Sequence, residues 1–425
     1  WIDNAANNVI GNGTASGRNL IAGLKTNVYA YGIAISGNGS TGNTVKGNII
    51  GIDKTGVALF ASKAFHGVQV TGGAGSNTIG GTGAGDGNVI SGHTQSGINL
   101  ANASGTNTLL GNIIGPQADG NTFVAGNTQS DGVSIWSSNN TVGGSSPGAR
   151  NIISGNVVNG MTMNGAGGCI LNNFQGNYIG LASNGTSFIA GSAQDQGIAM
   201  GNQISNNTIG GNILSGNTNS GISIVGGATG NFVQGNIIGP RADGNTLVAG
   251  NQQQYGVYLW TSDNNTIGGN TVNTRNIISA NTQYGIYMIG AACFGQVVRG
   301  NYIGLASDGI SVISGSTQNY GIWIASSSSN IIGGNTAEER NVISANGLFG
   351  VYLNGSGACS SNIIKGNYIG LDASGTTFIA GSSQDYGIAF VAGATNNTVG
   401  GGSSGDGNVI SGNVDPNIVI SYSSE

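Results

Sequence analysis

Short apolar runs recur along the chain, and glycine and small polar residues separate them. The runs follow a fixed order: NTIGG, NVISG and GINL within 77–100, then GNIIG, FVAGN and GVSI within 111–135. In GINL and GVSI, apolar residues alternate with polar ones, as in a strand with one buried face. Runs this short, bounded by turn-forming residues, predict strands rather than helices.

Two kinds of unit alternate with a fixed period. The first, N-T-I-G-G or a near copy, occurs at 77–81, 140–144, 207–211, 265–269, 330–334 and 397–401, with a weaker copy at 8–11. The second, G-N-x-I-G, occurs at 47–51, 111–115, 176–180, 235–239, 300–304 and 366–370. Each unit is counted from the Asn of N-T or from the equivalent position, which is residue 231 in the unit that contains 235–239. Counted in this way, successive units start 30–35 residues apart, except for a spacing of 24 between 207 and 231.

This period predicts an all-β fold, a right-handed parallel β-helix (β-solenoid) with two alternating coil types. We expect about thirteen coils of ~33 residues, each with three short strands. The repeat extends from about residue 8 to 415, so we predict a single domain over 1–425, with a short strand and tail at 416–425.

Asparagine occupies fixed positions in the repeat. One register contains Asn48, Asn112, Asn177, Asn236, Asn301 and Asn367, and another contains Asn156, Asn217, Asn281, Asn346 and Asn413. Asparagine tolerates left-handed turns and bonds nearby backbone. We interpret these residues as structural, with amides that bond into the coil between.

Units such as NTIGGTGAGDGNVISG and NIISGNVVNGMTM resemble the right-handed parallel β-helix repeats of large secreted or surface bacterial proteins. That family includes pectin- and alginate-active enzymes, phage tailspikes, adhesins and surface-layer modules. The resemblance therefore implies the fold and an extracellular or cell-surface location, and it leaves the role open.

Composition narrows the possible partners. Only 6 % of residues are charged, the net charge is −5 and the pI is near 4.8. Without a basic patch, we expect no nucleic-acid partner. No apolar run approaches the ~18 residues of a membrane span. The chain begins at Trp1, which indicates a processed chain or a fragment.

The acidic residues fall in turns, so we predict no catalytic residue, no metal site and no cofactor. Asp119, Asp243 and Asp308 stand in D-G turns, and two coils separate Asp243 from Asp308, roughly 10 Å. That separation is too long for a retaining glycosidase pair. His66 and His93 have no partners at metal-ligand spacing, and His93 replaces the asparagine of S-G-N.

Two further columns carry chemistry. Lys46, Arg299 and Lys365 share a column with Leu110, Gln175 and Gln234, which is too little charge for an anion site. Cys169, Cys293 and Cys359 also align. Cys293 and Cys359 would be about 9–10 Å apart, so we expect buried thiols rather than an internal disulfide.

Aromatic residues appear in two columns in the second half of the chain. At the alternating position of G-apolar-x-apolar they are Tyr258, Tyr287, Trp323 and Tyr352, and before the glycine they are Tyr255, Tyr284, Tyr320, Phe349 and Tyr386. One interpretation is a ladder that stabilises the fold. The other is an exposed surface that binds a sugar polymer or a protein. A residue before the glycine can also point inward.

The leading hypothesis is a non-enzymatic, extracellular structural or adhesive β-solenoid. Such a protein could serve as a head-to-tail filament subunit or as a surface fibre. It follows from the uncapped repeat, whose open ends can meet other copies of the chain. The alternative is a polysaccharide-binding or polysaccharide-cleaving β-helix that uses the aromatic residues as a sugar platform. The partners would be other copies of the chain or an extracellular polysaccharide.

Overall fold

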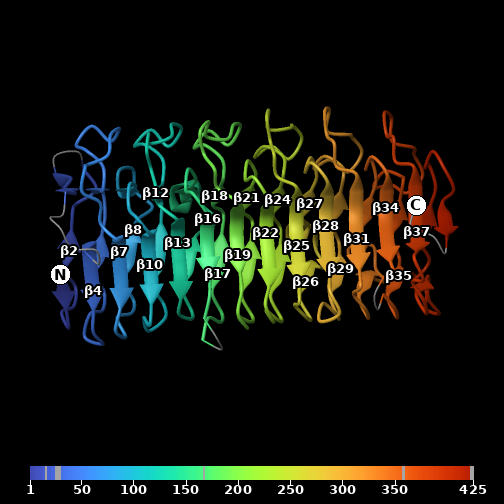
Figure 1. Ribbon diagram of the computed structural model, residues 1–425, viewed down its shortest axis with the longest axis horizontal. Coiled ribbons are helices and arrows are strands. Elements are labelled where there is room, and N and C mark those ends of the chain that lie inside the picture. Colours follow the sequence, from blue (N-terminus) through green and yellow to red (C-terminus); the bar gives the residue numbers. More distant parts are fainter. Residues whose placement is uncertain (15–16, 24–29, 166–167, 357–358, 422–425) are drawn as a thin grey trace. The chain divides into compact units, whose positions relative to one another are not determined.

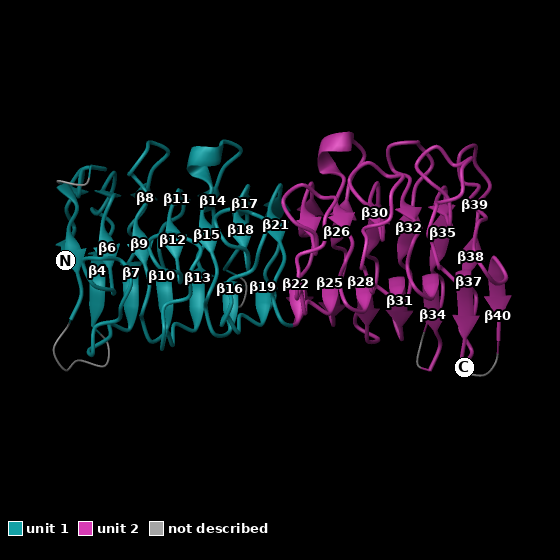
Figure 2. Ribbon diagram, turned by 90° about the horizontal axis from the view of Figure 1, so that it is seen from above, with its two compact units in different colours: residues 1–218 teal, residues 219–425 magenta. Residues whose placement is uncertain are grey.

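The computed structural model describes residues 1–425 except 15–16, 24–29, 166–167, 357–358 and 422–425. The chain forms two compact units, residues 1–218 and 219–425, which are described separately (Figure 2). Each unit is a parallel β-solenoid with three sheets, and each coil supplies one short strand to each sheet. The predicted all-β solenoid is confirmed, whereas the single domain stays a prediction.

Unit 1 places every third strand in the same sheet, in chain order (Figure 1). Its first sheet contains β1 (Ile2–Asp3), β4 (Tyr31–Ser36), β7 (His66–Thr71), β10 (Ser96–Ala101), β13 (Asp131–Trp136), β16 (Asn159–Met163) and β19 (Gln196–Met200). The second contains β2 (Val9–Ile10), β5 (Thr44–Val45), β8 (Thr78–Gly80), β11 (Thr108–Leu110), β14 (Thr141–Gly143), β17 (Asn173–Gln175) and β20 (Thr208–Gly210). The third contains β3 (Leu20–Ile21), β6 (Ile49–Ile50), β9 (Val89–Ile90), β12 (Ile113–Ile114), β15 (Ile152–Ile153), β18 (Tyr178–Ile179) and β21 (Ile213–Leu214).

Unit 2 repeats this arrangement. Its first sheet contains β22 (Ser220–Val225), β25 (Tyr255–Trp260), β28 (Tyr284–Ile289), β31 (Tyr320–Ala325), β34 (Phe349–Asn354), β37 (Tyr386–Val391) and β40 (Ile418–Ile420). The second contains β23 (Phe232–Gln234), β26 (Thr266–Gly268), β29 (Val297–Arg299), β32 (Ile331–Gly333), β35 (Ile363–Lys365) and β38 (Thr398–Val399). The third contains β24 (Ile237–Ile238), β27 (Ile277–Ile278), β30 (Tyr302–Ile303), β33 (Val342–Ile343), β36 (Tyr368–Ile369) and β39 (Val409–Ile410).

The described part of the chain includes two single-turn 3₁₀ segments, η2 (Pro147–Ala149) in unit 1 and η3 (Val272–Thr274) in unit 2. Across those same residues, no helix has the length and apolar character needed to cross a membrane.

The glycine inside each first-sheet strand is required by close packing. A Cβ on Gly285 would lie 2.6 Å from the Gly321 carbonyl oxygen, a distance at which neighbouring backbone must shift. The apolar residues that follow, such as Ile286 and Met288, are fully buried. The side chain between the apolar pair, here Tyr287, therefore lies on the opposite, outer face of the strand.

Rows of side-chain amides run through both units. In unit 2 they are Asn231, Asn265, Gln296, Asn330, Asn362 and Asn397; Asn236, Asn276, Asn301, Asn341, Asn367 and Asn408; and Gln253, Asn281, Gln318, Asn346, Gln384 and Asn413. At most links a side-chain nitrogen donates to the side-chain oxygen one coil later. At Gln296 Oε1 and Asn330 Oδ1 the donors are instead the backbone nitrogens of Asn265 and Gln296. The Asn301 Nδ2, for example, donates to Asn341 Oδ1 at 2.9 Å and to the Ile267 carbonyl at 3.0 Å. The predicted structural role, with bonds into the intervening coil, is confirmed.

One row of unit 1 is incomplete at His93. Downstream, Gln129 Nε2 donates to Asn156 Oδ1 at 2.9 Å, and Asn156 Nδ2 donates to Gln194 Oε1 at 2.9 Å. His93 stands in S-G-H where Asn156 stands in S-G-N, so an asparagine there would donate to Gln129 Oε1. That oxygen is buried and has no hydrogen-bond partner among the described residues. Burial lowers the pKa of His93 to about 3.

We expect His93→Asn to stabilise the chain and to reduce its sensitivity to acid. The pKa of His93 is about 3 when folded and ordinarily 6.5, so the unfolded chain binds more protons between these values. Stability is therefore complete above pH 6.5 and lost as the pH falls towards 3. The loss from this residue is about 2–3 kcal/mol between pH 7 and pH 4.5.

The measurement is the free energy of unfolding of both proteins at these two pH values. Some acid sensitivity remains in the variant, because burial also lowers the pKa of His66, to about 4. An unchanged pH dependence in His93→Asn would contradict this account of the interrupted row.

We expect Asn301→Ala to lower the free energy of unfolding by about 2–5 kcal/mol, because it leaves several buried groups without partners. The groups affected are Asn276 Nδ2, Asn341 Oδ1 and the Ile267 carbonyl. Asn335→Ala is the control, since Asn335 is exposed and its loss should cost less than about 0.5 kcal/mol. Equal effects of the two substitutions would show that the amide rows contribute little.

Candidate functional site

The nine aromatic residues predicted from the sequence lie together on the first sheet of unit 2, and we call them the aromatic strip. It comprises Tyr255, Tyr258, Tyr284, Tyr287, Tyr320, Trp323, Phe349, Tyr352 and Tyr386. Their strands β25, β28, β31, β34 and β37 lie side by side (Figure 1). The pairing is in register, so that Tyr255 lies opposite Tyr284, and Tyr258 opposite Tyr287. The predicted two columns over five successive coils are therefore present.

The column before the glycine is a continuous stack of rings. Successive ring centroids from Tyr255 to Tyr386 are 5.2, 5.2, 5.5 and 4.9 Å apart, with interplanar angles of 18° or less. Each inner ring has both faces covered by its neighbours. Ring edges and hydroxyl groups are thus the parts of this column that are left for solvent or a ligand.

The second column packs against the first with more varied geometry. Tyr287 stacks on Tyr284 at 5.0 Å, whereas Trp323 meets Tyr320 edge-on at 4.5 Å. These contacts show that residues before the glycine lie on the same side of the sheet as the second column. They do not point inward. Pairs of this kind contribute about 0.5–1.5 kcal/mol each beyond area burial, so the strip also stabilises unit 2.

The strip is less exposed than the sequence indicates. Most of its rings are half-buried, and Tyr352 is only 4 % exposed, because the rings cover one another. Trp260 follows the second column at the end of β25 and is 49 % exposed. It presents the ring surface that the stacked tyrosines lack.

The hydroxyl groups of the strip are neutral and largely unused by the protein. Burial, together with the nearby Tyr284, raises the pKa of Tyr287 to about 12. Burial also raises the pKa values of Tyr258, Tyr284 and Tyr320. Among the described residues, none forms a hydrogen bond with the phenol oxygens of Tyr255, Tyr258, Tyr284, Tyr287 or Tyr320.

The same two columns are mainly polar in unit 1, although Tyr31 lies in the first of them and stacks on His66 at 5.8 Å. Asp131 accepts hydrogen bonds from Thr162 Oγ1 at 2.8 Å and Asn159 Nδ2 at 3.1 Å, and burial raises the pKa of this carboxyl. His66 Nε2 lies 3.0 Å from Asn99 Nδ2. The solenoid therefore forms without the rings, which shows that aromatic residues are an addition to these columns and not a requirement of the fold.

Carboxylates elsewhere support turns, as predicted. Asp243 accepts from the backbone nitrogens of Asn245 and Thr246, and Asp308 accepts from those of Ile310 and Ser311. Within the described ranges, no group of three or more His, Cys, Asp or Glu side chains has the arrangement of a metal site.

The basic column and the cysteines also have structural partners. Lys46 pairs with Asp86 at 3.1 Å, Lys365 pairs with Asp406 at 3.0 Å, and Arg299 pairs with Glu339. The three cysteines are buried and free, and their thiols point to carbonyls one coil earlier, Ile135, Leu259 and Ile324.

Sequence reasoning missed three cation–π pairs. Arginine guanidinium carbons lie 4.0–4.2 Å from tyrosine ring centroids in the pairs Arg150–Tyr178, Arg275–Tyr302 and Arg340–Tyr368. The signal was present, because in each case an Arg-Asn pair precedes a third-sheet strand and an Asn-Tyr pair starts the next one. These pairs tie successive coils together.

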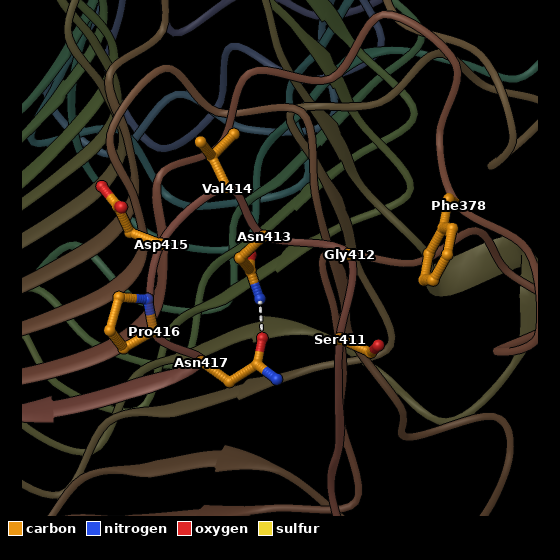
Figure 3. A pocket seen from close by; sticks show the side chains of 8 residues that line it. All are labelled: Phe378, Ser411, Gly412, Asn413, Val414, Asp415, Pro416 and Asn417. Atoms are coloured by element: carbon orange, nitrogen blue, oxygen red, sulfur yellow. Dashed lines mark hydrogen bonds between the residues drawn. The ribbon is translucent and has the colours of Figure 1, made fainter.

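A hollow of about 720 Å³ in unit 2 is a second candidate (Figure 3). It is lined by Phe378 and by residues 411–417, with Phe378 and Asp415 on opposite sides. Between them, Asn413 Nδ2 donates to Asn417 Oδ1 at 2.8 Å. The hollow thus continues an amide row, and its single ring and single carboxylate do not form a set comparable to the strip.

No protein-family model and no curated protein matches the chain. Solved structures do match. The Dettilon tailspike protein is 16 % identical with a TM-score of 0.50, over 95 % of this chain and 61 % of the tailspike. The mannuronan C-5 epimerase A-module of Azotobacter vinelandii is 10 % identical with a TM-score of 0.38, over 96 % of this chain and 89 % of the module. A periplasmic alginate epimerase is 13 % identical with a TM-score of 0.33, over 91 % of this chain and 74 % of the epimerase.

At these identities the tailspike likeness shows a shared β-helix fold, and this chain spans about three fifths of the tailspike's length. The leading prediction of a non-enzymatic structural or adhesive fibre is wrong by these comparisons. The similar structures are named as a tailspike protein and as epimerases of alginate and mannuronan, and none of these three is named as a structural or adhesive fibre. The error arose because an uncapped repeat is common to fibres and enzymes alike. End-to-end stacking stays a prediction.

We expect Tyr287, and with it Tyr258, Tyr284 and Tyr320, to ionise late in an alkaline titration. The pKa of Tyr287 is about 12 when folded and ordinarily 10, so the folded state holds its proton more tightly. Stability from this residue is complete below pH 10 and lost as the pH rises towards 12. Phenolate absorbance should show a late component that is reduced in Tyr287→Phe. Titration of all 13 tyrosines near pH 10 would contradict the packing of the strip.

Proposed function

We propose that the chain is a carbohydrate-active β-helix protein and that unit 2 binds a polysaccharide along the aromatic strip. The observation that carries the proposal is the continuous row of half-buried rings, in which the hydroxyls of Tyr255, Tyr284 and Tyr320 have no hydrogen-bond partner among the described residues. Five strands at a spacing of about 4.8 Å give a strip on the order of 20 Å long. This length suits several sugar units of a polymer better than one sugar.

The strip is pre-organised for binding. Stacked rings lose little conformational freedom when a ligand arrives, because their neighbours already fix them. The hydroxyl groups of Tyr255, Tyr284 and Tyr320 can each donate to and accept from a sugar hydroxyl. Trp260 adds an exposed ring against which the apolar face of a sugar can pack.

This recognition differs from the flat platform expected from the sequence. Sugar rings cannot lie on the faces of the inner tyrosines, since neighbouring rings cover those faces. Hydroxyl groups and ring edges therefore supply most of the contact, and Trp260 supplies the stacking. The alginate and mannuronan epimerases found by comparison are compatible with a polysaccharide ligand, although the proposal rests on the strip.

The proposed ligand also fits a location outside the cytoplasm. Polysaccharides long enough to cover the strip are found in the medium, on cell surfaces and in the periplasm. One of the similar epimerases is periplasmic. We propose that the protein acts in such a compartment.

We expect Trp260→Ala to weaken polysaccharide binding about tenfold through loss of the stacking surface. The matched control is Trp136→Ala in unit 1, because Trp136 occupies the same column and is 45 % exposed but has polar neighbours. Affinity electrophoresis of the full chain against a panel of neutral and acidic polysaccharides gives the measurement.

A double variant, Tyr284→Phe with Tyr320→Phe, separates binding from stability. It removes two hydroxyls and keeps the stack, as Phe349 does naturally in the same column. We expect about tenfold weaker binding with an unchanged melting temperature. If the variant binds like the parent, or if no polysaccharide binds the parent, the strip is only a stabilising ladder.

A further inference from the structure

We propose that the strip selects an uncharged polysaccharide and discriminates against polyuronates such as alginate and pectate. This inference rests on the proposed function and adds the ligand class to it. It is drawn from the distribution of charge over unit 2 and from the partners that its basic side chains already have.

The negative charge of the protein lies in unit 2. Residues 219–425 contain five Lys or Arg residues and ten Asp or Glu residues, which gives a formal charge of −5. Residues 1–218 contain six of each and are formally neutral. An anionic polymer that approaches the strip therefore meets a field of its own sign, which disfavours association.

Two of the five cations in unit 2 are held on tyrosine rings of the third sheet. The guanidinium of Arg275 lies over Tyr302, and that of Arg340 lies over Tyr368. Their Nε atoms donate to the carbonyls of Gly300 and Gly366 at 3.2 Å. Both side chains are thus fixed to the third sheet, whereas the strip belongs to the first.

Two of the other three cations pair with carboxylates. Arg299 and Lys365 end strands of the second sheet and pair with Glu339 and Asp406. Arg241 lies two residues before Asp243, in the turn that this carboxylate caps, and its buried Nε has no hydrogen-bond partner among the described residues. The five strands that carry the strip contain no Lys or Arg at all.

The groups that remain on the strip are neutral. Rings, ring edges and phenol hydroxyls can match the hydroxyl groups and C–H faces of a neutral sugar. A uronate carboxylate would lose water on the same surface without gaining a cation, and partial burial makes that loss costly. Uncharged sugar units are therefore the ligand that this surface fits best.

The test compares two ligand classes on the full chain: a neutral set of β-glucan, xylan and galactomannan, and an acidic set of alginate and polygalacturonate. At low salt we expect at least one neutral polymer to bind at least about tenfold more tightly than either acidic polymer. Affinity for the neutral polymer should change less than about twofold when salt is raised well beyond physiological strength, because no ion pair is screened.

A variant with an added positive charge tests whether the lack of cations on the strip is what disfavours acidic polymers. Ala325 ends β31 beside the strip and is only partly buried, so Ala325→Lys places a cation at the edge of the strip. We expect Ala325→Lys to increase alginate binding at low salt at least about threefold, and Ala325→Gln, the uncharged control, to leave it unchanged.

The outcomes distinguish the two proposals. Acidic polymers that bind as tightly as neutral ones, or more tightly, would overturn the ligand class and leave polysaccharide binding intact. Binding to neither set would overturn the proposed function itself. Neutral binding that resists salt, with alginate binding gained only in Ala325→Lys, supports both.

Discussion

The hydrogen-bonded rows of buried asparagine and glutamine are the constraint on which both units depend. A solenoid turns sharply between its short strands, and each turn buries backbone groups that no sheet satisfies. An amide can donate and accept at once, so one side chain both receives a bond from the preceding coil and gives one to the next, as Asn301 does between Asn276 and Asn341. Because a buried amide without partners is costly, successive coils supply an amide at the same position, and the interruption at His93 leaves Gln129 Oε1 without a hydrogen-bond partner among the described residues. This requirement fixes the register of all three sheets in each unit.

The fixed register places residues from the same position of successive coils next to one another on one surface. Once each coil is aligned, a position that recurs along the sequence becomes a column along the sheet. The glycine before each apolar pair is crowded against the next coil, and ring contacts such as Tyr284–Tyr287 place the residue before the glycine on the same outer face as the residue between the apolar pair. Those positions tolerate histidine, aspartate and asparagine in unit 1 and stacked rings in unit 2. The same framework therefore carries different chemistry without any change in its core.

The strip shows how stability and recognition share one set of residues. Stacking covers the inner faces of the tyrosine column, holds the rings rigid and raises the pKa values of several phenols. The hydroxyl groups left over form a neutral, ordered surface. The strip also lacks positive charge, because four of the five basic side chains of unit 2 are held by tyrosine rings or carboxylates away from the first sheet. A surface of this kind suits a ligand with many hydroxyl groups and no charge.

The sequence by itself determined the repeat, the three strands per coil, the structural role of the asparagines and the alignment of the nine rings in two columns. These features are local or periodic, and a period of about one coil converts directly into register. Tertiary structure alone decided how the rings face one another, how little of Tyr352 is exposed, that about half of Trp260 is exposed, and that four of the five basic side chains of unit 2 already have a partner. Such properties depend on side-chain torsions and on neighbours one coil away, which a sequence pattern does not specify. Function was the least predictable part, because the repeat that builds the fold is shared by proteins with unrelated roles.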